Sequence, residues 1–249
     1  MTKKITLYQA MKQSGLFTSK KEIIAAANDK RVTIDGVVTP ALQFQFSPTK
    51  RKLCIDGKEI SLQQKKYFVL NKPVGYSCQK NETEPYAATL LHTTETVKNS
   101  LFPVGRLDFG TTGLLIITND GDFSAALMEP QRKVPKTYRV SLKQKVTAYQ
   151  INALEKGVFI AVDDEKYQTL PATVQKIDDH TIEIVIVEGK NRQVRKMVEA
   201  VGNATTALCR VAIGNFVLDK DLEEGRWKEY SEKELRERIF GTIVEDINN

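Results

Sequence analysis

One carboxylate, Asp108, stands among glycines directly before an apolar run in this chain. Gly105, Gly110 and Gly113 surround it, and residues 114–117 are all leucine or isoleucine. A carboxylate at the mouth of a buried strand lies where burial can tune its acidity and where the scaffold can fix its direction. Glycines allow sharp turns and close approach of a ligand. Asp108 is therefore the first candidate for nucleophilic or acid–base chemistry, although a buried cap or a structural ion pair fits the same pattern.

A second candidate segment, residues 187–202, predicts a helix with two different faces. Its apolar positions are Val194, Met197, Val198 and Val201. Its charged positions are Arg192, Arg195, Lys196 and Glu199. Arginines near the start of such a helix can reach a phosphate or a buried carboxylate. Taken alone, an ordinary amphipathic helix with an Arg195–Glu199 pair is the simpler interpretation.

An aromatic residue, Tyr138, stands among cations at the start of a predicted strand. The cations are Arg132, Lys133, Lys136 and Arg139. Tyr138 could stack on a base while the cations hold a nucleic-acid backbone. A half-buried strand tyrosine is the alternative, and is favoured when the segment is viewed in isolation.

The positive charge of the chain is concentrated at its N-terminal end. The net charge is +6, with 37 Lys and Arg against 31 Asp and Glu. Residues 1–66 carry 13 Lys and Arg against 5 Asp and Glu, a net of +8, and the remainder carries 24 against 26, a net of −2. A small basic module on a near-neutral body favours a polyanionic partner, with RNA or DNA ahead of a membrane.

The N-terminal periodicity predicts two short helices and a hairpin. Leu7, Met11 and Leu16, and then Ile23, Ile24 and Ala27, recur at helical spacing, and Thr18-Ser19 precedes the second run as a cap. Asp35-Gly36 predicts a type I′ turn. The unit resembles the S4 RNA-binding domain through residues 14–16, 19–21 and 30–36. The resemblance implies RNA contacts from Lys20, Lys21, Lys30 and Arg31.

The rest of the chain predicts an α+β fold. Strands are expected at residues 67–70, 113–118, 136–142 and 181–187, and helices at 123–128, 148–156, from about 191, and 231–239. Without regular alternation, this order favours a largely antiparallel mixed sheet. We expect an S4-like domain at 1–60, which includes a strand pair around Asp56-Gly57, a linker at 61–66 and a catalytic domain at 67–249.

Together these segments resemble the RsuA branch of the pseudouridine synthases, the group that includes RluB, RluE and RluF, over nearly the whole chain. The matching motifs are Lys72-Pro73-Val74-Gly75, Gly105-Arg106-Leu107-Asp108 with Thr111-Thr112-Gly113, Lys136-Thr137-Tyr138, and residues 188–195. The resemblance implies isomerisation of a uridine in ribosomal RNA to its C-glycoside, without a cofactor or a metal.

The resemblance also implies a role for each site residue. Asp108 is the catalytic carboxylate, whether as a nucleophile toward sugar or base or as a base that removes a sugar proton. Arg195 pairs with Asp108 and keeps it ionised. Tyr138 stacks on the uracil, and Arg106 holds the flipped nucleotide open. Arg192 contacts RNA.

Three alternatives stay open at this level. Ribosomal RNA of the small subunit (16S) is the favoured substrate over 23S RNA of the large subunit. A ribosome-assembly factor that binds RNA without turnover, and a hydrolase that releases uracil, would share many of these residues. His92 and His180 show no metal-ligand or triad spacing, and no phosphate loop follows Gly110, so zinc, ATP and nicotinamide chemistry are not expected.

The composition predicts a cytoplasmic protein. Its three cysteines, Cys54, Cys78 and Cys209, are widely separated, which argues against a disulfide framework. The start of the sequence lacks an apolar core of signal-peptide length, and no apolar run approaches the roughly 20 residues that span a bilayer. We expect a monomer that binds ribosomal RNA or a pre-ribosomal particle and does not associate with membranes.

Overall fold

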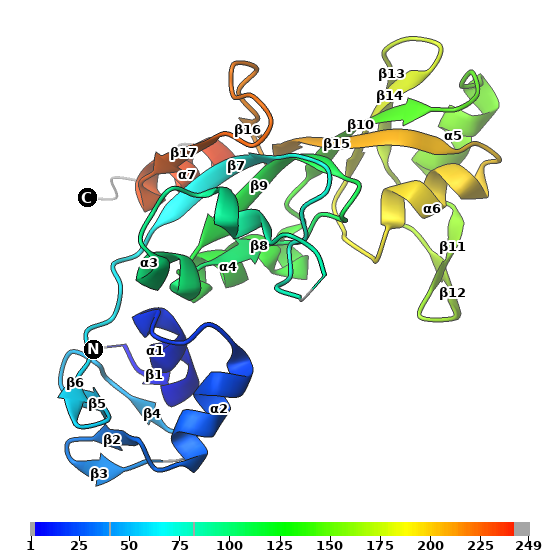
Figure 1. Cartoon of the computed structure of the whole chain (residues 1–249). Coiled ribbons are helices and arrows are strands. Elements are labelled where there is room, and N and C mark those ends of the chain that lie inside the picture. Colours follow the sequence, from blue (N-terminus) through cyan, green and yellow to red (C-terminus); the bar gives the residue numbers. More distant parts are fainter. Residues whose placement is uncertain (1–2, 40, 82, 242–249) are drawn as a thin grey trace, which may run out of the picture. The chain divides into compact units, whose positions relative to one another are not determined.

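The computed structural model describes residues 3–39, 41–81 and 83–241, and the chain divides into two compact units. The first unit comprises residues 1–66 together with 91–102. The second unit comprises residues 67–90 and 103–249. This division differs from the expected one at two places, since it assigns residues 61–66 and 91–102 to the first unit. The two units are described separately below (Figure 1).

The first unit combines three helices with short strands. These elements are β1 (Ile5–Thr6), α1 (Leu7–Ser14), α2 (Lys20–Asn28), β2 (Val32–Ile34), β3 (Val37–Val38), β4 (Gln45–Phe46), β5 (Leu53–Ile55), β6 (Lys58–Glu59) and α3 (Glu95–Ser100). Four strands form a sheet in the order β3-β2-β5-β6. Asp35 and Gly36 have φ values of 52° and 80°, which confirms the predicted turn with two left-handed residues.

Local residue types determine where α2 begins and where α1 ends in this unit. The Ser19 hydroxyl accepts a hydrogen bond from the Glu22 amide, which confirms the predicted cap of α2. The helical spacing of Leu7, Met11 and Leu16 does not extend to Leu16, because α1 ends at Gly15 in a left-handed conformation and Leu16 beyond it is 47% exposed. Phe17 is buried in its place.

Residues 91–102 join the first unit because α3 packs against α1. The Lys12 ammonium donates to the Asn99 carbonyl. A Cβ atom built on Gly15 would lie 1.8 Å from the Thr96 carbonyl oxygen, so the two backbones are in close contact. Gln63 of the expected linker is also held, since its side-chain amide donates to the Ser14 carbonyl. These contacts are too distant in sequence to be visible from periodicity.

The second unit is built on one large sheet. Its helices are α4 (Gly121–Met128), α5 (Ala148–Lys156), α6 (Gln193–Ala200), α7 (Glu232–Phe240), and the short 3-10 turns η1 (Ala87–Leu90) and η2 (Pro130–Arg132). Its strands are β7 (Tyr67–Lys72), β8 (Phe102–Val104), β9 (Thr112–Thr118), β10 (Lys136–Leu142), β11 (Phe159–Val162), β12 (Glu165–Gln168), β13 (Thr173–Lys176), β14 (Thr181–Ile186), β15 (Thr205–Ile213), β16 (Phe216–Val217) and β17 (Trp227–Tyr230).

The order of the large sheet confirms the expected mixed and largely antiparallel arrangement. The strands run β13-β14-β10-β15-β9-β7-β17, with β16 beside β15 and β8 beside β9. Along this path only β15 and β9 are parallel, and their register pairs Arg210 with Gly113. A Cβ atom on Gly113 would lie 2.3 Å from the Arg210 carbonyl oxygen, and Gly113 has a φ of 101°. Glycine is therefore required where these two strands meet.

Two apolar clusters hold the second unit together. In the first, α5 and α6 pack on β10, β13 and β14 around residues such as Val140, Ile184 and Met197. In the second, α4 and α7 pack on β7 and β9 around residues such as Leu114 and Phe123. Of the four predicted apolar positions, Val194, Met197 and Val198 of α6 are buried, whereas Val201 at the end of α6 is half-buried. No helix in the described ranges is long and apolar enough to span a bilayer.

We expect Gly15→Ala to destabilise the first unit by about 3 kcal/mol, because left-handed strain adds to a clash with the Thr96 carbonyl. Gly36→Ala is the matched control, since Gly36 is also left-handed but a Cβ atom added to it would meet no atom within 4 Å. It should cost only about 1 kcal/mol. Urea denaturation with hydrogen exchange of the α1 amides measures both losses. Equal losses would contradict the packing of α3 against α1.

Candidate active site

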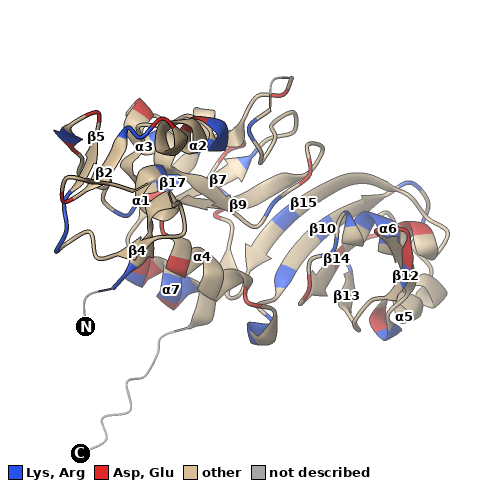
Figure 2. Cartoon of the chain, turned by 90° about the horizontal axis from the view of Figure 1, so that it is seen from below, with Lys and Arg blue, Asp and Glu red and all other residues tan. Residues whose placement is uncertain are grey.

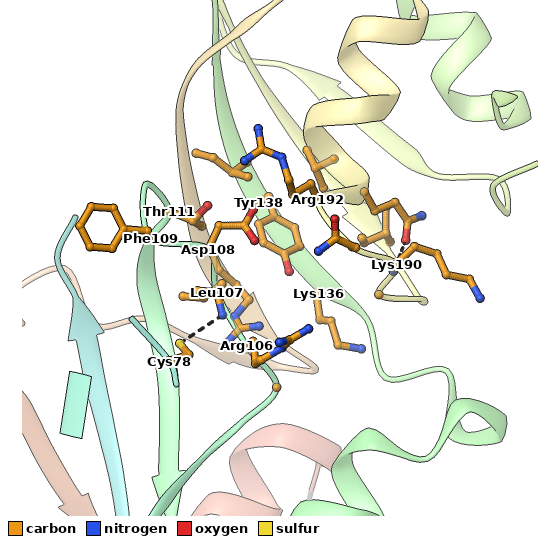
Figure 3. A pocket seen from close by; sticks show the side chains of 18 of the residues that line it. Cys78, Arg106, Leu107, Asp108, Phe109, Thr111, Lys136, Tyr138, Lys190 and Arg192 are labelled. Carbon is orange, nitrogen blue, oxygen red and sulfur yellow. Dashed lines mark hydrogen bonds between the residues drawn. The ribbon is translucent and has the colours of Figure 1, made fainter. Parts of the chain in front are cut away.

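A cavity of about 430 Å³ opens on the second unit, and the residues expected to do chemistry line it (Figure 3). Asp108, Arg106 and Tyr138 all contribute to its wall. Its cationic side chains are Arg106, Lys136, Lys190, Arg192 and Arg210, and its carboxylates are Asp108 and Glu84. Its aliphatic wall is made by Leu107, Ile186, Val194 and Leu208. Such an excess of cations over carboxylates suits a polyanionic ligand.

Asp108 lies in the loop between β8 and β9, and main-chain hydrogen bonds shape this loop. The Thr111 amide donates to the Asp108 carbonyl over 3.0 Å. The Leu107 amide donates to the Cys78 sulfur over 3.3 Å (Figure 3). Burial raises the pKa of the Cys78 thiol, so it stays protonated and acts as part of the loop support. The Asp108 side chain is half-buried and extends into the cavity (Figure 3).

The Lys72 ammonium fastens the Asp108 loop from the end of β7. Lys72 is fully buried, and its Nζ donates to the carbonyls of Pro73, Asp108, Phe109 and Thr111 over 3.0, 3.3, 3.4 and 2.8 Å. Burial lowers the pKa of Lys72. The Gly75 amide adds a bond of 3.1 Å to the Phe109 carbonyl. The Lys72–Gly75 motif therefore holds the Asp108 loop in place.

Tyr138 and Lys136 reach the cavity from β10. Tyr138 is opposite Arg210 of β15, so both side chains belong to one face of the sheet. Lys136 donates to the Val134 carbonyl over 3.0 Å. Burial lowers the pKa of Lys136, and the nearby Arg210 charge lowers it further. Lys and Arg residues mark β10, β15 and the start of α6 in Figure 2.

Arg195 does not make the expected ion pair. Its guanidinium donates to the Gly110 carbonyl over 2.9 Å, two residues beyond Asp108. Among the described residues, no ion pair joins Arg195 to Asp108 or to Glu199, and Arg195 is not part of the cavity wall. Arg195 thus braces the loop rather than the carboxylate.

The loop before α6 is held from the side by Glu188. Its carboxylate accepts from the Tyr167 hydroxyl at 2.6 Å, the Leu170 amide at 2.9 Å and the Gln193 side-chain amide at 2.5 Å. The Lys190 ammonium lies 4.5 Å from the centre of the Tyr167 ring. The β11–β12 hairpin therefore supports the loop that presents Lys190 and Arg192 to the cavity.

Comparison with known proteins identifies the family. Residues 66–200 match the family model for RNA pseudouridylate synthase. The chain belongs to this family. It is 34% identical over 223 residues to the uncharacterized RNA pseudouridine synthase YtzG of Bacillus subtilis, covering 88% of this chain and 92% of the relative. It is 35% identical over 206 residues to ribosomal small subunit pseudouridine synthase A of Escherichia coli, covering 82% and 87%.

A solved structure extends this similarity to almost the whole chain. A crystal structure of a pseudouridylate synthase matches with a TM-score of 0.68 and 29% identity, and covers 94% of this chain and 100% of its own. The match supports the assignment of the chain to the RsuA-like pseudouridine synthases. No group of three His, Cys, Asp or Glu side chains is placed to hold a metal ion in the described ranges.

The predicted RNA contacts of the first unit are at its surface. Lys20 and Lys21 lie in the first turn of α2, and both are exposed, as is Lys30. Arg31 is also exposed, but it makes a bidentate pair with Asp56, with distances of 2.8 and 2.6 Å. This pair raises the pKa of Arg31 and lowers that of Asp56. Arg31 is therefore already bonded within the unit, in contrast to the other three side chains, which make no such pair within the described ranges.

Three residues of the site were not singled out from the sequence: Lys72, Glu188 and Arg210. The sequence indicates Lys72 only as part of a turn and Glu188 only as part of a motif. Arg210 had a signal, because it replaces an apolar residue in the alternation of Leu208 and Ala212 along β15. A charged residue at an inward position of a strand is unusual enough to mark a functional site.

We expect Lys72→Met to lower the free energy of unfolding by about 3 kcal/mol and to loosen the Asp108 loop, because four carbonyls lose their donor. Hydrogen exchange should become faster at the Thr111 and Gly75 amides. Lys143→Met, which changes an exposed lysine of the same unit, is the control. Unchanged exchange in the Lys72 variant would show that the ammonium does not hold the loop.

Proposed function

We propose that this enzyme isomerises a specific uridine of ribosomal RNA to pseudouridine, with Asp108 as its catalytic residue. The observation that carries the proposal is the convergence of Asp108, Tyr138 and Arg106 on one cavity lined by five cationic side chains. A single carboxylate beside an aromatic ring suits a reaction that detaches a base, retains it and rejoins it. A pure RNA-binding factor has no need of this combination.

Each residue has a distinct task in this reaction. Asp108 acts on the sugar or the base as a nucleophile, or removes a sugar proton as a base, and the site is compatible with all three. Tyr138 stacks on the uracil and keeps it in the cavity while it turns. Arg106 is exposed at the mouth and holds the nucleotide out of the RNA stack. Arg195 acts through the loop that carries Asp108, and Arg192 contacts the RNA backbone.

We infer that the substrate is 16S RNA of the small ribosomal subunit. The similarity to ribosomal small subunit pseudouridine synthase A of Escherichia coli, at 87% coverage of that protein, supports this choice. The alternative is large-subunit RNA. This alternative is supported by 33% identity to a putative ribosomal large subunit pseudouridine synthase, SVR1 of Arabidopsis thaliana, of which the match covers 54%.

We further propose that residues 1–60 form an S4-like RNA-binding module, followed by a linker at 61–66 and the catalytic domain at 67–249. The exposed Lys20, Lys21 and Lys30 would contact RNA phosphates, with a smaller share from Arg31 because of its pair with Asp56. We also propose that the enzyme acts as a monomer in the cytoplasm, away from membranes and without a cofactor.

Asp108→Asn should abolish pseudouridine formation, a loss of roughly 1,000-fold or more, because the amide is neither a nucleophile nor a base. Carbodiimide-induced stops of reverse transcriptase on 16S and 23S transcripts and on assembled subunits measure the product. Asp221→Asn, which changes an exposed aspartate, is the control. An abasic site would identify a hydrolase, and no new stop with the wild-type enzyme on any of these substrates would favour an assembly factor.

Replacing both Lys20 and Lys21 with glutamine should reduce the slope of log affinity against log salt by about 1 to 2, because each phosphate contact releases counterions. The fall in affinity should be similar for different RNA sequences. The control is the double change of Lys143 and Lys156 to glutamine in the second unit. Equal slopes for the Lys20/Lys21 variant and the wild type would exclude these lysines from the RNA contact.

A further inference from the structure

Arg210 is a buried cation with one unsatisfied nitrogen at the cavity. Its side chain is only 2% exposed. Its Nε donates to the Leu114 carbonyl over 2.8 Å, which fixes the direction of the guanidinium. Its Nη2 is buried and has no hydrogen-bond partner among the described residues. Buried donors are nearly always paired in folded proteins, so an orphaned guanidinium nitrogen calls for a ligand.

A second orphaned atom belongs to another residue of the same cavity wall. Within the described ranges, three buried side-chain nitrogen or oxygen atoms lack a partner, and those of Arg210 and Thr111 belong to residues of the cavity wall. Thr111 is 2% exposed, and its main chain is engaged with Asp108 and Lys72. Two unsatisfied polar groups at one cavity indicate that its occupant is polar at that end.

The backbone places Arg210 beside both Tyr138 and the Asp108 loop. On one side it is opposite Tyr138 in the antiparallel register of β10 and β15. On the other side it is paired with Gly113, at the start of the strand that follows the loop. The guanidinium extends toward the turn at Gly105, where a Cβ atom added to the glycine would lie 3.9 Å from Nη1. A base stacked on Tyr138 would therefore lie close to Arg210.

We propose that Arg210 binds the target uracil, with Nη2 donating to one of its ring carbonyl oxygens. This inference rests on the proposed function. In the isomerisation, the bond between C1′ and N1 breaks and its electron pair moves into the ring, where the carbonyl oxygens carry the negative charge. The bond between C1′ and C5 then forms from ring electrons, C5 loses its proton, and N1 gains one. A fixed, buried cation at a carbonyl oxygen stabilises the charged ring in this step.

Arg210 would act on the chemical step more than on RNA affinity. Its charge is buried away from the exposed RNA contacts, and the ring charge that it meets develops only during the reaction. The single-turnover rate constant should therefore fall in a variant while the dissociation constant of the RNA is nearly unchanged. A merely structural arginine would weaken folding, binding and rate together.

The test compares RNA substrates that carry uridine, 2-thiouridine or 4-thiouridine at the target position, because sulfur is a weaker hydrogen-bond acceptor than oxygen. With the wild-type enzyme, one of the two sulfur substitutions should slow the single-turnover reaction. In Arg210→Met the rate with uridine should fall roughly 10- to 100-fold, and the sulfur effect at that position should disappear. Arg210→Lys should recover part of the rate. Arg226→Met, which changes an exposed arginine of the same unit, is the control.

Each outcome separates the inference from the proposed function. Absence of a sulfur effect at both positions in the wild-type enzyme overturns the inference without any variant, even if the Arg210 variants fail to fold. An unchanged sulfur effect in folded Arg210→Met overturns it as well. If the wild-type enzyme forms no pseudouridine in uridine-containing ribosomal RNA, the proposed function fails first.

Discussion

The buried ammonium of Lys72 is the interaction on which the site depends. It bonds to main-chain carbonyls of the turn after β7 and of the loop before β9. It therefore joins the end of β7 to the Asp108 loop. A charged donor in a low-dielectric interior binds neutral carbonyls strongly. Because all its partners are backbone atoms, the conformation of the loop is specified independently of which side chains follow Asp108. Arg195 reinforces this from the other side by bonding to the Gly110 carbonyl.

The second constraint is the close approach of β9 and β15. Their short parallel pairing at Gly113 joins the part of the sheet covered by α4 and α7 to the part covered by α5 and α6. A side chain at position 113 would push the strands apart. The Asp108 loop enters this pairing from one side, and Tyr138 approaches it through β10. Gly113, which follows the Asp108 loop, therefore also aligns the Tyr138 side of the cavity with Asp108.

The sequence predicted the local elements well and the contacts between them poorly. β10 (Lys136–Leu142) and α5 (Ala148–Lys156) match their expected bounds, and the Asp35-Gly36 turn has the expected conformation, because periodicity, capping and turn chemistry are local. The strands β13 and β15 were not predicted. The packing of residues 91–102 with the first unit and the bond from Arg195 to Gly110 depend on the tertiary arrangement. The sequence motifs indicated Asp108, Arg106 and Tyr138 as candidates, and all three line the cavity.

Lys72 and Arg210 show how equal burial can serve different ends. Both are cations with almost no exposed surface. Lys72 bonds to the Asp108 loop, and Arg210 is paired with Gly113 directly after that loop. The Lys72 ammonium donates to four carbonyls. These hydrogen bonds offset the free-energy cost of burying its charge, and its role is structural. Arg210 is anchored by one bond from Nε while Nη2 has no partner in the described chain. An unsatisfied buried donor disfavours the ligand-free state, and a ligand that supplies the missing acceptor gains that free energy on binding. Hydrogen-bond saturation, rather than burial or charge, therefore distinguishes the cation that holds the Asp108 loop from the cation that keeps an unsatisfied donor at the cavity.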